Sequence, residues 1–78
     1  MMRKPWEDQP WLRLYRAALL ELNPAKLPVS AEVAEIAIRT RVLELKLSRG
    51  DNRELMALDH ALCVLRLLVE HQRLRRAA

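Results

Sequence analysis

The chain has 78 residues, which is enough for one small domain and too few for two independent hydrophobic cores. Hydrophobic residues make up 51% of it and charged residues 31%, a balance that excludes a natively disordered tail. With 1 glycine, no phenylalanine and a bias toward Leu, Ala, Arg and Glu, the composition favours helices over a β-barrel or β-sandwich. We therefore expect one all-α domain over residues 1–78.

Cysteine content and hydropathy indicate where such a protein works. The single cysteine, Cys63, excludes an intrachain disulfide and suits a reducing compartment, so we expect a cytoplasmic protein. The first residues lack the apolar segment of a signal peptide. Arg66 and Glu70 interrupt the richest apolar stretch before it reaches the roughly 20 residues that span a bilayer, so no membrane contact is expected.

The prolines separate an N-terminal arm, residues 1–9, from a first helix. Pro10 suits the first turn of a helix, where its missing N–H costs nothing. Apolar residues then recur every three or four positions, which predicts a helix over 10–22: Trp11, Leu12, Tyr15, Ala18, Leu19 and Leu22. Asn23 and Pro24 end this helix, and Asn23 can cap a single turn after it.

A second helix is predicted over residues 30–47. Ser30 is a candidate N-cap, although Pro28 could equally be the first helical residue. The apolar residues form a seam, which we expect to face the core, and an adjacent second stripe. The seam contains Val33, Ile36, Thr40, Leu43 and Leu47, and the second stripe contains Ala34, Ile38, Val42 and Leu45. Gly50 can adopt the left-handed conformation that ends a helix.

The third helix is predicted over residues 51–75. Asp51 and Glu54 have the spacing of a capping box at its start. Its seam contains Leu55, Leu58, Leu62, Leu65, Val69 and Gln72, and its second stripe contains Ala57, Val64, Leu67 and Leu74.

These elements predict a short helix followed by a long antiparallel helical hairpin. The short helix covers only part of the hairpin, so the second stripes have no partner within one chain. Dimerisation would complete a helical bundle, and a monomeric three-helix bundle is the alternative. We expect the core to contain Val33, Ile36, Leu43, Leu58, Leu62 and Leu65, where substitution by alanine should cost about 2–5 kcal/mol each.

Reactive side chains are few and point to no enzyme. His60, Cys63 and His71 share one helix with Asp59, but they spread over more than about 15 Å, whereas a zinc site needs four converging ligands. Cys63 is better interpreted as a small core residue and His60 as a polar group on the helix surface. No phosphate-binding or hydrolase motif occurs. We expect no catalytic residue, no cofactor and no metal.

The residues most suited to contact a partner are aromatic, aliphatic and basic. Trp11 is in phase with the first helix and should anchor it, whereas Trp6 either docks on the bundle or recognises a partner. The full set of candidates is Trp6, Trp11, Leu58, Leu62, Leu65, Arg73, Arg75 and Arg76. The sequence therefore favours a small non-enzymatic protein–protein interaction or adaptor module.

Nucleic-acid binding through the basic termini is the alternative, given a net charge of +4. The C-terminal arginines also have a structural explanation, because cations stabilise the C-terminal end of a helix.

Residues 11–28 carry the pattern W-x-x-x-Y-x-A-A-L-L-E-x-N-P-x-K-L-P. This pattern resembles the opening of a group of short bacterial proteins without an established activity, in which a helix of the A-E-x-A-I type follows, as at residues 34–38. The resemblance implies a bacterial, intracellular, helical protein and assigns no functional residue. Val29 and Ser30 depart from the group, where charged residues are usual.

Overall fold

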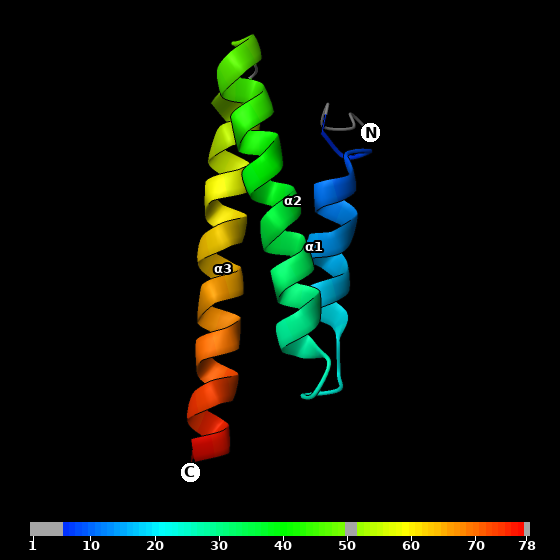
Figure 1. Ribbon diagram of the computed structural model, residues 1–78, viewed down its shortest axis with the longest axis vertical. Coiled ribbons are helices and arrows are strands. Elements are labelled where there is room, and N and C mark those ends of the chain that lie inside the picture. Colours follow the sequence, from blue (N-terminus) through cyan, green and yellow to red (C-terminus); the bar gives the residue numbers. More distant parts are fainter. Residues whose placement is uncertain (1–5, 50–51, 78) are drawn as a thin grey trace.

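The computed structural model describes residues 6–49 and 52–77, and within them it contains three helices and no strand. The helices are α1 (Pro10–Leu20), α2 (Leu27–Ser48) and α3 (Asn52–Ala77). The predicted all-α class is confirmed. In Figure 1, α2 lies between α1 and α3, and the chain runs in alternating directions through the three helices.

The three helices form a thin layer. The molecule measures 44 × 28 × 15 Å, and its smallest dimension is little more than the diameter of one helix, about 10–12 Å. Helices α1 and α3 both pack along α2 and meet each other much less. Residues of all three helices meet in one core on one side of α2, and the opposite side of α2 is open.

Helix α1 ends two residues before the predicted boundary. Glu21 is extended (ψ 115°), and its backbone N–H donates to the carbonyl of Ala18 at 3.3 Å. The Oδ1 atom of Asn23 accepts from the backbone N–H of Ala25 at 2.9 Å, and the carbonyl of Asn23 accepts from Lys26 at 3.0 Å. The single turn predicted at Asn23 is therefore confirmed, and the chain must leave α1 at Glu21 to make it.

Helix α2 begins at Leu27, with Pro28 in its first turn. The prediction that Ser30 caps this helix is wrong, because the Ser30 backbone N–H already donates to the carbonyl of Lys26 at 3.0 Å. At the other end the left-handed residue is Arg49 (φ 55°, ψ 47°). The predicted roles of Gly50 and Asp51 fall outside the described residues.

The core corrects the assignment of faces on α2. Ala34 and Ile38 are fully buried, and Ala31 and Leu45 are 4% exposed, so the stripe predicted as secondary faces the core. The predicted core residues Val33, Ile36 and Leu43 are 44%, 59% and 62% exposed, and this part of the core prediction is wrong. Small alanines let α2 approach its neighbours closely, which larger residues would prevent.

The seam predicted on α3 does face the core. Leu58 and Leu65 are buried, Leu55, Leu62 and Val69 are half-buried, and Leu67 and Leu74 on the second stripe are exposed. Both tryptophans belong to this core: Trp11 is 2% exposed and anchors α1, and Trp6 is 8% exposed. Of the two possibilities for Trp6, docking on the bundle is the one found.

Candidate interaction surface

The most extensive apolar surface on α2 is the side turned away from both neighbouring helices. We call it the outer face, and it consists of Val29, Val33, Ile36, Thr40, Leu43 and Leu47. The exposed fractions of its aliphatic residues range from 44% at Val33 to 85% at Leu47. The residues follow one another at intervals of four and three, the heptad pattern by which one helix packs against another.

The outer face lies opposite the part of α2 that contacts the core. We call the latter the inner face, and it consists of Leu27, Ala31, Ala34, Ile38 and Leu45. At 3.6 residues per turn, the centres of the two faces are roughly 170° apart around the helix. A helix that is apolar on opposite sides is typical of one buried between two layers. Within one chain, α2 has only the inner layer.

Charged residues border the outer face along its full length. Glu32, Arg39 and Lys46 follow one flank at intervals of seven residues and are all exposed. Arg39 donates from Nη2 to Oε1 of Glu35 at 2.6 Å, so its charge is balanced within the same helix. On the opposite flank, Glu44 accepts from Arg41 at 3.1 Å.

Glu54 joins the three helices from inside. Its carboxylate is 6% exposed and accepts from Trp11 Nε1 of α1 at 3.1 Å and from Arg41 of α2 through two bonds, Nε to Oε2 at 2.7 Å and Nη2 to Oε1 at 3.1 Å. A fork-to-fork pair of this kind is among the stronger side-chain interactions. The hydrogen bond to Glu54 raises the pKa of Arg41 above its ordinary value. The sequence indicated Glu54 only as part of a cap and did not reveal this network.

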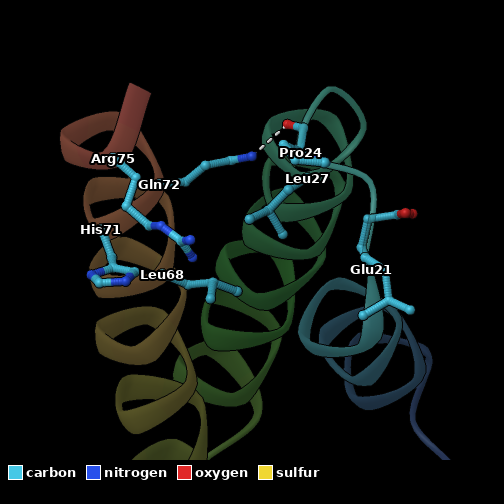
Figure 2. A pocket seen from close by; sticks show the side chains of 8 residues that line it. Glu21, Pro24, Leu27, Leu68, His71, Gln72 and Arg75 are labelled. Atoms are coloured by element: carbon cyan, nitrogen blue, oxygen red, sulfur yellow. Dashed lines mark hydrogen bonds between the residues drawn. The ribbon is translucent and has the colours of Figure 1, made fainter. Parts of the chain in front are cut away.

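A second polar contact ties α3 to the connection between α1 and α2. Gln72 donates from Nε2 to the carbonyl of Pro24 at 2.6 Å. Beside it lies a cavity of about 350 Å³, shown in Figure 2, with Leu27 and Leu68 among its lining residues. The guanidinium of Arg75 reaches over this cavity, whereas the carboxylate of Glu21 points away from it. The half-open cavity is a surface hollow between helix ends.

The residues predicted to contact a partner fall into two groups. Trp6, Trp11, Leu58 and Leu65 are buried in the core of this chain, and Leu62 is half-buried against it. Arg73 and Arg75 are exposed on the last turns of α3, and the Arg76 side chain lies outside the described part. The outer face of α2 contains none of these candidates. Its signal in the sequence was the heptad seam, which was assigned to the core.

The reactive side chains of α3 lie on its surface. Cys63 is exposed, so its interpretation as a small core residue is wrong; it lies on the side of α3 turned away from the core. His60 and His71 are exposed as well. Among residues 6–49 and 52–77, no three His, Cys, Asp or Glu side chains are placed to hold one metal ion.

No helix in the described ranges combines the length and apolar character needed to cross a bilayer. Comparisons of the chain with protein families, with curated proteins and with solved structures found no match. The resemblance of residues 11–28 to short bacterial proteins stays a prediction.

Proposed function

We propose that this protein is a small non-enzymatic interaction module that works as a homodimer, with the outer face of α2 as its binding surface. The observation that carries the proposal is the exposed heptad row opposite the core of the same helix. Five large aliphatic side chains of this row are between 44% and 85% exposed. Soluble monomers seldom expose contiguous apolar patches larger than a few hundred Å², and larger ones mark interaction sites.

The energetics of a thin helical layer support self-association. Burying a large aliphatic side chain contributes about 1.5–3 kcal/mol relative to full exposure. Burying the outer face in a dimer would therefore contribute several kcal/mol of favourable free energy. This gain opposes the entropy that is lost on association. If two copies of the chain packed with α2 against α2, each α2 would be buried on both sides. The two small three-helix units would then form one larger helical bundle.

We place this module in the cytoplasm. The lone thiol of Cys63 is exposed on α3. Such a thiol is best kept reduced, which the cytosol provides.

Light scattering over a concentration series tests the proposal with a matched pair of variants. Leu43 on the outer face and Leu67 on α3 are 62% and 70% exposed, so replacing either with glutamine perturbs a similar surface residue. We expect the wild type and Leu67→Gln to approach twice the chain mass of 9.1 kDa, and Leu43→Gln to stay nearer the chain mass. A wild type that is monomeric at every concentration would overturn the proposal, as would equal dissociation of both variants.

A further inference from the structure

We propose that the second copy lies antiparallel along the outer face of α2, with the two-fold axis passing beside position 38 and two intermolecular ion pairs fixing the register. This inference rests on the proposed function, because it specifies how the same surface is occupied. It commits to one occupant, a second copy of this chain, and to one direction for it. The argument comes from the order of the apolar residues and from the charges that border them.

The apolar residues match themselves when the row is reversed. In the antiparallel register, Val29 packs against the partner's Leu47, Val33 against the partner's Leu43, and Ile36 against the partner's Thr40. Each of these three pairs contains a β-branched residue. The two-fold axis generates the same three pairs a second time, with the two chains exchanged. The polar atom in this row is already satisfied, because Thr40 Oγ1 donates to the carbonyl of Ile36 in its own helix at 2.9 Å.

Charge complementarity selects this direction. Glu32 and Lys46 lie on the same flank, seven residues before and after Arg39. Reversal brings Glu32 beside the partner's Lys46 and Lys46 beside the partner's Glu32, which gives two symmetric ion pairs. The two copies of Arg39 meet near the axis, where each is balanced by Glu35 of its own helix at 2.6 Å.

The opposite flank is compatible with the same arrangement. Ala37 lies near the axis; it is half-buried against the core of its own chain, and its methyl side chain adds no bulk on that flank. Ser30 falls beside the partner's Glu44, where a hydroxyl and a carboxylate can share a hydrogen bond. A parallel dimer would instead leave Glu32 about 21 Å along the axis from the partner's Lys46, too far for an ion pair.

Charge reversal distinguishes the two directions. In Glu32→Lys both pairs become Lys–Lys, and in Lys46→Glu both become Glu–Glu, so we expect the dimer Kd of each variant to rise on the order of tenfold at low salt. In the double variant, Glu32→Lys with Lys46→Glu, each pair is restored with its signs exchanged, and the Kd should return to within about threefold of the wild type. Asp59→Lys on α3 makes the same charge change as Glu32→Lys on an exposed residue outside α2 and should leave the Kd unchanged.

Mixing the two single variants sharpens the test. A heterodimer of Glu32→Lys with Lys46→Glu contains two attractive pairs, whereas each homodimer contains two repulsive ones. Sedimentation equilibrium of the equimolar mixture should therefore show tighter association than either variant alone, and the difference should shrink at high salt.

Failure of the register can be told apart from failure of the proposed function. If the double variant is as weak as the singles and the mixture gains nothing, the antiparallel register is overturned. Dissociation by Leu43→Gln would still support α2 as the dimer surface. A monomeric wild type would overturn both.

Discussion

The two sides of α2 are both apolar, but only one of them is buried within the chain. The inner face contains Ala31 and Ala34 beside Ile38 and is closed by α1 and α3. The outer face contains the larger set of branched side chains, with Ile36 59% and Leu43 62% exposed. The inner face thus mixes two alanines with large residues, whereas the outer face has no alanine and leaves its large side chains exposed.

This contrast shows what a heptad row on a helix can and cannot reveal. Apolar periodicity identifies a face that will be buried, but it does not say whether the partner is the same chain or another. Alanine is a weak signal of burial by itself, yet it permits the short interaxial distances at which three helices form one layer.

The largest difference is expected from a matched pair of isoleucines. Ile38 is fully buried on the inner face, and Ile36, two residues away, is 59% exposed on the outer face. Ile38→Ala should lower the free energy of unfolding by about 2–5 kcal/mol, because it removes buried methylenes and leaves a cavity. Ile36→Ala should cost under about 1 kcal/mol at low protein concentration, where the outer face is exposed to solvent.

Urea unfolding followed by circular dichroism measures both variants. Equal losses of stability from Ile36→Ala and Ile38→Ala at low concentration would mean that the two faces are not distinguished within one chain.

Arg41→Ala should have the next largest effect. It leaves the carboxylate of Glu54, which is 6% exposed, without its cation, and a cost of about 3 kcal/mol is typical of such a broken pair. Arg39→Ala is the control, because it removes an exposed pair worth about 0.3–0.5 kcal/mol. Thermal unfolding midpoints measure both variants. A larger drop in the midpoint for Arg39→Ala than for Arg41→Ala would contradict the structural role of the Arg41–Glu54 pair.

The contribution of this pair to stability should not change across neutral pH. Hydrogen bonding to Glu54 raises the pKa of Arg41 in the folded chain. A raised pKa gives a stabilisation that is complete below the ordinary arginine value and is lost only as the pH rises through the raised one. The difference between wild type and Arg41→Ala should therefore be the same on both sides of neutrality.

Adding bulk to the inner face should also destabilise the fold. Ala34 is fully buried, so Ala34→Leu forces α2 away from its neighbours, at a cost of about 1–3 kcal/mol. Ala17→Leu makes the same change at an exposed position of α1 and should be nearly neutral. Urea denaturation midpoints measure the two variants. An equal fall for Ala34→Leu and Ala17→Leu would show that Ala34 is not closely packed against the neighbouring helices.

The smallest effect is expected at the end of α2, and it is stabilising. Arg49 adopts φ 55° and ψ 47°, a left-handed conformation that costs a non-glycine residue roughly 1 kcal/mol. Arg49→Gly should raise the midpoint of thermal unfolding by a few degrees at most. A lower midpoint would indicate that the Arg49 side chain contributes more than its backbone strain costs.

Much of the fold follows from local patterns, and the errors have physical causes. The seam of α3 was predictable because its three-and-four spacing coincides with the side of the helix that packs on the core, where Leu58 and Leu65 are buried. The faces of α2 were exchanged because both sides of the helix are apolar and the stripe with the heptad spacing was assigned to the core. The role of Glu54 was hidden because its partners, Trp11 and Arg41, are distant in sequence and meet it only in the folded layer.

The central claim is that the outer face of α2 is covered by a second copy of the chain. Its most direct test is the unfolding midpoint of the wild type measured over a wide range of protein concentration, with Ile36→Ala alongside. Because association stabilises the folded state by mass action, the wild-type midpoint should rise with concentration and the rise should be smaller in Ile36→Ala. A wild-type midpoint that is constant over the whole range would contradict the claim.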